Sequence, residues 1–444
     1  MRVSRCLQTG LLRAWCAGLI FLCFVHGFAA EPAAPERAFP GAEGWAAGTP
    51  GGRGGKILRV TTLAATGPGS FLEALNTPGP RIIVFEVGGV IDLDRQKVNI
   101  TQPFLTIAGQ TAPSPGITLI RNNIFIQTHD VVIRHIRVRP GEAGHAKKSG
   151  WDADAITASK GSRDVIVDHC SFSWATDENL DTWGDPFKGA TPEEWHANNV
   201  QRVTYSHNII AEGLNDSTNT KGPHSKGMLI GDNTSYILVL GNLFADNVER
   251  NPEIKGGVWT AVVNNYIYNP SVTSVLYHMP EKRWEGHEYI HGRLELVGNV
   301  MRHGPDTIKQ LTLFRFVGVG DLELYAADNL TVDQAGQPMA ITTEDNRYGG
   351  KILPQSAHFL WPAGLQPLPA SQVQEHVLRD AGARSWDRDA IDQRIIQQTI
   401  DGTGHVIDNE TQGGGYPAPK ETRQPFNPDD WDLRTMERRA TPVK

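Results

Sequence analysis

Four aspartates in two closely spaced pairs are the first residues that could act together chemically. Asp152 and Asp154 flank one alanine, and Asp177 and Asp181 follow in a second short segment. Alternate side chains of a strand point to the same side, so the first pair can face outward together. Carboxylates gathered on one face repel each other unless a cation lies among them, and an all-oxygen ligand set is typical of calcium. The pattern fits either a calcium site or a solvated acidic edge, and no histidine cluster at ligand spacing supports zinc.

Three cationic side chains follow downstream, at Lys226, Arg250 and Lys255. Cations beside a metal cluster, on a chain whose formal net charge is −7, indicate an anionic substrate. The alternative is that they form ion pairs with nearby acidic residues, namely Glu249, Glu253 or Asp246.

Composition excludes two broad classes of protein. The 444 residues contain 42 Lys and Arg against 49 Asp and Glu, with no basic block, so a general nucleic-acid-binding protein is excluded. A hydrophobic content of 39% with 11 Trp excludes a disordered chain.

The N-terminal 30 residues have the pattern of a secretory signal peptide. Arg2, Arg5 and Arg13 precede an apolar run over residues 14–25, and small residues follow. Cleavage after Ala29 or Ala30 would release a secreted chain, extracellular or periplasmic, with a net charge of −10 and no membrane attachment; an uncleaved anchor is the alternative. Cys170 would then be the only cysteine, so the mature chain has no intramolecular disulfide.

The body of the chain predicts a stack of short strands. Residues 82–85, 131–133 and 236–240 are examples of β-branched runs broken by Gly, Asn and Asp. No long segment of helical period separates these runs, which disfavours an alternating strand–helix sheet.

Asparagine recurs after the strands. The recurrent positions are Asn208, Asn242, Asn265, Asn299 and Asn329. Irregular spacing of this size is typical of a solenoid, in which stacked asparagines bond neighbouring turns. We therefore predict an all-β, single-stranded parallel β-helix over residues 31–330, with a sandwich or propeller as the alternatives. The glycine-rich residues 40–55 are expected to cap one end of it.

A partly helical C-terminal extension is expected over residues 331–444. Helices are predicted at residues 371–381, capped by Ser371, and at residues 387–400, where Ile391 and Ile395 share one face. The extension is expected to lie along the solenoid.

Several stretches together resemble pectate lyases of polysaccharide lyase family 1, in the bacterial branch. The stretches are Ala-Phe-Pro-Gly-Ala-Glu-Gly at residues 38–44, Thr-Ile-Ala-Gly-Gln-Thr-Ala-Pro at 106–113, Asp-His-Cys-Ser-Phe-Ser-Trp at 168–174 and Arg-Asn-Pro at 250–252. The resemblance implies a right-handed parallel β-helix and calcium-dependent cleavage of pectate, the acidic polysaccharide α-1,4-polygalacturonate. It also implies a monomer.

The same resemblance implies roles for the residues noted above. Asp154, Asp177 and Asp181 would bind calcium, and Asp152 would assist through a second ion or a water molecule. Arg250 would take the C5 proton in a β-elimination, and Lys226 and Lys255 would bind substrate carboxylates. Lys255 stands where the family often has a second arginine. A lysine there keeps the positive charge but loses the bidentate hydrogen-bonding geometry of a guanidinium. His169 is expected to be structural.

Two other functions remain open from the sequence. A glycoside hydrolase of the polygalacturonase type would use two of the aspartates as acid and base. A non-catalytic glycan-binding β-helix would tolerate the loss of Arg250.

Overall fold

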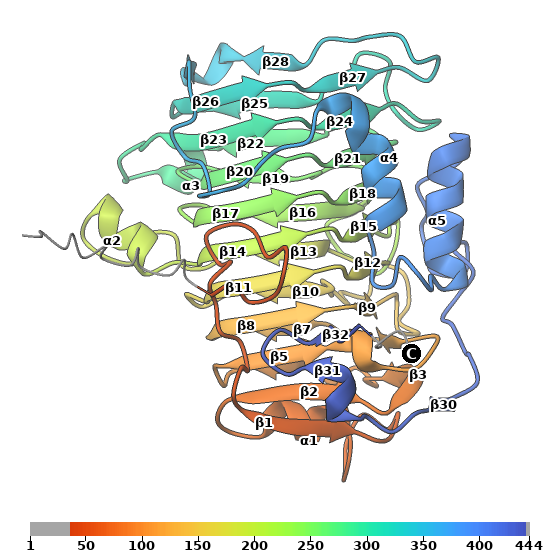
Figure 1. The fold of residues 1–444 in the computed structure, drawn as a ribbon. Coiled ribbons are helices and arrows are strands. Elements are labelled where there is room, and N and C mark those ends of the chain that lie inside the picture. Colours follow the sequence, from red (N-terminus) through yellow and green to blue (C-terminus); the bar gives the residue numbers. More distant parts are fainter. Residues whose placement is uncertain (1–35, 441–444) are drawn as a thin grey trace, which may run out of the picture. The chain divides into compact units, whose positions relative to one another are not determined.

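The computed structural model describes residues 36–440, so the predicted signal peptide lies outside the described residues. Residues 37–440 form one unit built from three parallel sheets that the chain visits in turn (Figure 1). The fold is the predicted right-handed parallel β-helix. Among the described residues, no helix is long and apolar enough to cross a membrane.

The first sheet has eleven strands. In spatial order they are β1 (Lys56–Val60), β2 (Arg81–Phe85), β5 (Leu105–Ala108), β8 (His129–Arg134), β11 (Arg163–Asp168), β14 (Gln201–Ser206), β17 (Ser235–Leu240), β20 (Trp259–Val263), β23 (Gly292–Val297), β26 (Leu322–Ala327) and β29 (Ile352–Pro354).

The second sheet has nine strands and the third has ten. The second contains β28 (Thr342–Asp345), β25 (Phe314–Gly318), β22 (Val275–Met279), β19 (Glu253–Lys255), β16 (Lys226–Ile230), β13 (Glu178–Thr182), β10 (Ile156–Ala158), β7 (Ile124–Ile126) and β4 (Val98–Ile100). The third contains β27 (Leu330–Val332), β24 (Val300–Arg302), β21 (Tyr266–Tyr268), β18 (Leu243–Ala245), β15 (Ile209–Ala211), β12 (Ser171–Ser173), β9 (Ile136–Arg139), β6 (Ile117–Ile120), β3 (Val87–Asp92) and the antiparallel β30 (Thr422–Arg423).

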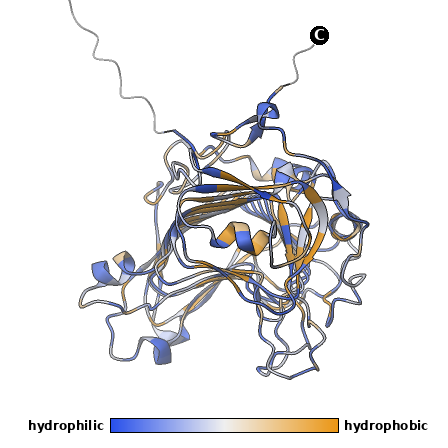
Figure 2. Ribbon diagram, turned by 90° about the horizontal axis from the view of Figure 1, so that it is seen from below, coloured by the Kyte–Doolittle hydropathy of each residue, from blue (hydrophilic) through white to orange (hydrophobic). Residues whose placement is uncertain are grey.

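A column of buried aliphatic and aromatic side chains fills the coil, because each short strand contributes inward-facing residues such as Ile133, Val167 and Tyr205. The amphipathic helix α1 (Phe71–Asn76) packs Phe71 and Leu75 onto the end of this column. Figure 2 looks onto that end of the coil. The glycine-rich N-terminal segment was expected to be the cap, and this prediction is wrong: Phe39 and Ala42 pack against Val132 and Ile166 on the outer face of the first sheet.

The asparagine ladder is confirmed. It lies in the turn from the first sheet to the third, where each Nδ2 donates to the Oδ1 of the next asparagine. The distances are 2.9 Å for Asn208–Asn242, Asn242–Asn265 and Asn265–Asn299, and 3.1 Å for Asn299–Asn329. The ladder satisfies polar groups that a tight buried turn would otherwise leave unpaired.

The sheets continue past residue 330, since β28 and β29 follow it. The side chains of β28 are polar and mostly exposed, so the hydrophobic pattern could not mark this coil. The division of the chain at residue 330 stays a prediction.

The two C-terminal helices lie against the third sheet (Figure 1). Helix α4 (Ala370–Asp380) and helix α5 (Ala390–Asp401) bury Val373, Val377 and Ile395 there. Ser371 does not cap α4, because the helix starts one residue earlier, after Pro369. The remaining short elements are α2 (Pro192–Ala197), α3 (Glu281–Trp284), η1 (Gly109–Thr111), η2 (Asn346–Tyr348), η3 (Pro428–Asp430), β31 (Trp431–Asp432) and β32 (Glu437–Arg438).

Candidate active site

The predicted aspartates lie on two neighbouring coils, at or near the points where strands β10 and β13 of the second sheet begin. Asp152 and Asp154 precede β10, whereas Asp177 precedes β13 and Asp181 lies within it. Thr157 of β10 pairs with Asp181 of β13 in parallel register, and paired strands lie about 4.8 Å apart. Carboxylate oxygens of Asp154, Asp177 and Glu178 lie within 4.8 Å of one another. The fold therefore brings Asp154 and Asp177 together, and all four predicted aspartates line one hollow of the surface.

The contacts around these carboxylates leave two buried oxygens without a hydrogen bond. Asp154 accepts a hydrogen bond from the Thr157 hydroxyl at 2.6 Å and one from the Glu178 backbone N–H at 3.2 Å. Asp181 Oδ1 is buried and accepts none; Asp177 Oδ1 also accepts none, although His224 Nε2 lies 2.5 Å away.

Burial, together with the crowding of like charges, perturbs the titration of these aspartates. Burial, with the charges of Asp177 and Asp152, raises the pKa of Asp154 to about 7. Burial and the charges of Asp154 and Asp177 also raise the pKa of Asp181 well above its usual value. Burial and the nearby Asp177 carboxyl raise the pKa of Asp152 to about 6. These shifts are those of a site that lacks compensating positive charge.

Asp177 is the exception in this group. Although its burial favours the neutral form, the close approach of the His224 imidazole and a hydrogen bond from the Lys221 ammonium hold the pKa of Asp177 well below its usual value. The Lys221 ammonium lies 2.7 Å from Asp177 Oδ2 and 3.5 Å from Asp152 Oδ2, so it joins the two aspartates.

The three predicted cations occupy the next two coils. Lys226 starts β16, Arg250 lies just before β19, and Lys255 ends β19. Each forms an ion pair with a carboxylate: Lys226 with Glu249, Arg250 with Glu178 and Glu253, and Lys255 with Glu253. The ion pairs that the sequence offered as an alternative therefore exist within the proposed site, except with Asp246, which is buried beside Asn269.

Two further pKa values report the electrostatics of this cationic set. Burial lowers the pKa of Lys226 to about 8, although the charges of Glu253 and Asp177 act against it. Burial would raise the pKa of Glu253, but His278, Lys255 and Arg250 outweigh it and hold that pKa well below its usual value. Glu253 is therefore an anion that balances the cations around it.

A shallow groove runs over these residues. One hollow of about 350 Å³ is lined by residues that include Asp154, Asp181, Lys221 and Arg250. A second, of about 320 Å³, is lined by residues that include Lys255 and Arg283. Trp183 and Leu229 line both hollows, and the Trp183 side chain is 48% exposed. The groove thus joins the acidic and the cationic residues.

The other two tryptophans near the acidic segments are placed differently. Trp174 is fully buried. Trp151 stacks on His145 and donates its indole N–H to the Gly141 carbonyl. Only Trp183 of the three is available to line the groove.

Sequence reasoning assigned no role to Glu178, Lys221 or His278, and it named Glu253 only as an alternative ion-pair partner of the cations. Glu178 is 4% exposed and contacts Arg250 from the coil that carries Asp177. The spacing of Glu253 and Lys255 on one strand was a usable signal, because alternate residues share a face. The approach of Glu178 to Arg250, 72 positions apart, depends on which coils stack, and the local pattern does not give that.

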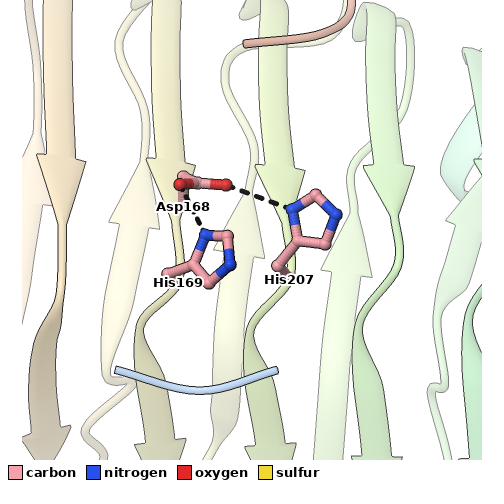
Figure 3. Close-up of side chains that lie close together, drawn as sticks. All are labelled: Asp168, His169 and His207. Carbon is pink, nitrogen blue, oxygen red and sulfur yellow. Dashed lines mark hydrogen bonds and ion pairs between the residues drawn. The ribbon is translucent and has the colours of Figure 1, made fainter. Parts of the chain in front are cut away.

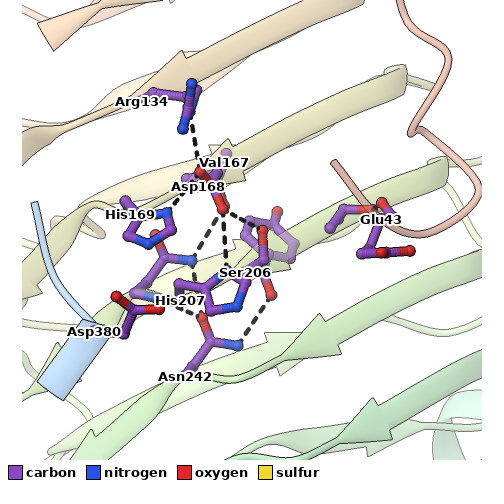
Figure 4. A network of polar contacts seen from close by, with 12 residues as sticks. Glu43, Arg134, Val167, Asp168, His169, Ser206, His207, Asn242 and Asp380 are labelled. Carbon is purple, nitrogen blue, oxygen red and sulfur yellow. Dashed lines mark hydrogen bonds and ion pairs between the residues drawn. The ribbon is translucent and has the colours of Figure 1, made fainter. Parts of the chain in front are cut away.

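A second cluster of metal-ligating residue types lies in another turn. Asp168, His169 and His207 gather between the first and third sheets (Figure 3). His169 Nδ1 lies 2.7 Å and His207 Nδ1 3.3 Å from Asp168. Arg134 pairs with the same carboxylate at 3.0 Å and the Ser206 hydroxyl donates to it at 2.7 Å (Figure 4). Asp168 is thus already charge-compensated, which favours the structural role expected for His169.

The chain is similar to several pectate lyases. A probable pectate lyase C of Aspergillus flavus is 33% identical over 393 residues, covering 85% of this chain and 81% of that protein. The one from Aspergillus fumigatus is 33% identical over 413 residues, covering 88% and 86%. Pectate lyase 5 of Ambrosia artemisiifolia is 30% identical over 51% of this chain and 55% of that protein. These relatives are fungal and plant proteins, so the expected bacterial branch is not supported.

Solved structures agree on the fold, although no family model matches the chain. The cedar pollen allergen jun a 1 superposes with a TM-score of 0.55 at 15% identity, covering 77% of this chain and 92% of that one. A pectate lyase described for its anti β-elimination mechanism gives a TM-score of 0.52 at 16% identity, covering 78% and 97%. With a third of its residues identical to those of the Aspergillus proteins over most of both chains, this chain belongs to the pectate lyase family.

Proposed function

We propose that the chain is a secreted enzyme that cleaves pectate by calcium-dependent β-elimination and releases 4,5-unsaturated oligogalacturonides. The observation that carries this proposal is one hollow in which Asp154, Asp177 and Asp181 lie beside Arg250, with Lys226 buried at the start of the strand β16 between their coils. Carboxylates without enough counter-charge beside buried cations fit a metal ion and an anionic polymer, and they do not fit a neutral ligand.

The donor set fits calcium. Asp154, Asp177 and Asp181 would hold the ion, with Asp152 assisting directly or through water. The buried Asp181 Oδ1, which accepts no hydrogen bond, is the specific support for this assignment, since such an oxygen is costly to leave unpaired. When bound, calcium neutralises the substrate carboxylate and so acidifies the adjacent C5 proton.

The cationic residues would orient the substrate and move the proton. Lys226 and Lys255 would bind uronate carboxylates and stabilise the negative charge that develops during elimination. Arg250 would accept the C5 proton while the C4=C5 double bond forms and the C4–O bond breaks, and solvent water would protonate the departing sugar oxygen. Trp183, exposed between the two hollows, would support a sugar ring.

The base role of Arg250 makes a specific demand. A guanidine accepts a proton only when neutral, and arginine is ordinarily always protonated. The contacts with Glu178 and Glu253 favour the protonated form. Proton abstraction therefore requires substrate binding to separate Arg250 from Glu178, which would lower the cost of the neutral form, while the remaining contact with Glu253 would keep part of that cost.

The proposal extends to location and organisation. Secretion rests on the signal-peptide pattern of residues 1–30, and the product would form outside the cytoplasm. The C-terminal extension, residues 331–444 as predicted, would serve as a brace for the β-helix, supported by the packing of α4 and α5 on the third sheet.

The test is ultraviolet absorbance of the unsaturated product on polygalacturonate, with calcium and then with excess chelator. We expect the absorbance to rise when calcium is present and this rise to stop when excess chelator is added. Replacing Arg250 with Lys, which keeps the charge, should lower kcat by at least about 100-fold with an unchanged melting temperature. New reducing ends without absorbance would instead support the hydrolase, and substrate binding without either signal would support a glycan-binding protein.

A further inference from the structure

We infer that Glu253 is a positioning residue for the reaction: its single carboxylate fixes the side chains of Arg250 and Lys255 in the groove, with His278 as a third partner. The inference rests on the proposed function, because it assigns to Glu253 an action through the two cations of that site.

Three cationic or proton-donating groups converge on this one carboxylate. Arg250 Nε lies 2.8 Å from Glu253 Oε2, and Lys255 Nζ lies 2.9 Å from Oε1. His278 Nδ1 donates to Oε1 at 3.0 Å. Glu253 is 4% exposed, so water does not compete for these contacts as it would at the surface.

Strand geometry explains why one residue reaches all three groups. Glu253 and Lys255 alternate on β19 and so share its outer face. Lys255 pairs in register with His278 of the next strand, β22. Arg250 lies three residues before Glu253 in the turn that leads into β19. The strand pairing thus brings the three partners to one point.

The contacts restrict Arg250 from two directions. The Glu253 carboxylate forms an ion pair at Nε, which donates no hydrogen bond, and Glu178 of β13 accepts a hydrogen bond from Nη1. If substrate binding separates Arg250 from Glu178, Glu253 is the contact that still orients the guanidinium. Lys255 depends on Glu253 for its position, because its ammonium group ends a flexible side chain and lacks the planar, bidentate donor geometry of a guanidinium.

A structural role alone would have a different signature. A buried ion pair contributes little to stability once its desolvation is counted, but removing one partner leaves uncompensated charge. Loss of stability therefore does not distinguish the two roles. Misplacement of a reacting group by about 1 Å lowers the rate by as much as about 100-fold, so kcat is the quantity to measure.

The test is Glu253→Gln in the full chain with calcium, assayed on polygalacturonate by absorbance of the unsaturated product. Glutamine keeps the shape and removes the charge. We expect kcat to fall by about 10- to 100-fold with KM changed by less than about 3-fold. His278→Ala, at a side chain that is one-third exposed, should lower kcat in the same direction by a smaller factor.

Glu295→Gln is the matched control. Glu295 is also fully buried and also pairs with a histidine, since His358 Nδ1 lies 2.6 Å from its Oε2. It lies on β23 of the first sheet, and its carboxylate bonds His358 and the backbone N–H groups of Phe359 and Leu360, away from the groove cations. Glu295→Gln should lower the melting temperature and leave kcat unchanged.

A double-mutant cycle shows whether Glu253 acts through Arg250. In an Arg250→Lys background, Glu253→Gln should lower kcat much less than it does in the wild type, because the guanidinium that Glu253 orients is gone. The ratio of kcat without and with Glu253→Gln should then be close to one. Wild-type kcat in folded Glu253→Gln and His278→Ala, or an equal loss in both backgrounds, would overturn the inference. Absence of any lyase activity in the wild type would instead overturn the proposed function, and the inference with it.

Discussion

The Lys221 ammonium lies 2.7 Å from Asp177 Oδ2, at the acidic end of the groove. It supplies positive charge where the carboxylates of Asp152 and Asp177 meet. A metal ion bound by the same carboxylates would share them with this lysine, and the two positive charges would repel.

Replacing Lys221 with Met should therefore tighten calcium binding. An exposed pair of this kind contributes at most about 1 kcal/mol, which corresponds to an increase of up to about 5-fold in affinity. Isothermal titration calorimetry with calcium measures it directly, and Lys188→Met, at an exposed loop position, is the control. Weaker calcium binding by Lys221→Met would mean that the lysine orients the ligands.

Asp154 should make stability depend on pH when calcium is absent. Its pKa is about 7 in the folded chain and about 4 in the unfolded chain. The folded state therefore holds a proton that the unfolded state releases, and stability falls as pH rises from about 4 to about 7.

Asp154→Asn isolates this effect, because both proteins share all other titrating groups. In excess chelator, the melting temperature of the variant relative to wild type should rise across that pH range and then level off. Calcium should stabilise the wild type and not the variant. A constant difference at all pH values would contradict the assignment of a raised pKa to Asp154.

Asn265→Ala should strongly destabilise the β-helix. The Asn265 amide donates to Asn299 and to the Val239 carbonyl, and its oxygen accepts from Asn242. Each buried partner left unpaired costs about 1–3 kcal/mol. Thermal unfolding measures the loss. Asn329→Ala, at the partly exposed last position of the ladder, should lower the melting temperature less because water can replace its contacts.

Trp183→Ala should weaken substrate binding more than it slows the chemical step. The indole is 48% exposed and lines both hollows of the groove, so it would contact the polymer in the ground and transition states alike. We expect a higher KM with a kcat near that of the wild type. Trp386, which is 58% exposed and lies outside both hollows, provides the control variant Trp386→Ala, whose KM should be unchanged.

The coiled fold could be predicted because its signals repeat along the chain. Strand-length runs and the asparagines from Asn208 to Asn329 mark each turn locally, and the ladder follows once turns stack. Helices α4 and α5 were predicted to within a few residues because the spacing of apolar residues in a helix is also a local signal. The prediction failed where the local pattern carries no information, as in the polar strand β28 and at the start of α4, where the helix begins directly after Pro369 and Ser371 does not cap it.

The residues of the candidate site also fall into two groups, those that a local motif identifies and those that only the stacking of the coils brings together. The aspartates and the three cations stand in recognisable motifs, so their types and order were available in advance. Glu249 and Glu253 stand close to the cations in the sequence and were named as ion-pair partners, whereas Glu178 was not, since it meets Arg250 only because β13 and β19 belong to nearby coils. Long-range pairing of this kind depends on the number of residues in each turn, which varies from coil to coil.

The polar strand at the far end of the second sheet has a consequence for self-association. The last strand of a parallel sheet presents unpaired backbone groups on which another chain can polymerise. Thr342, Thr343 and Glu344 are exposed on β28, and Asp345 is engaged by Arg347 at 2.6 Å. A second molecule that added a strand there would bury these charged and hydroxyl groups and would gain no apolar contact that offsets the cost. The coil can thus end in open solvent without seeding a fibre.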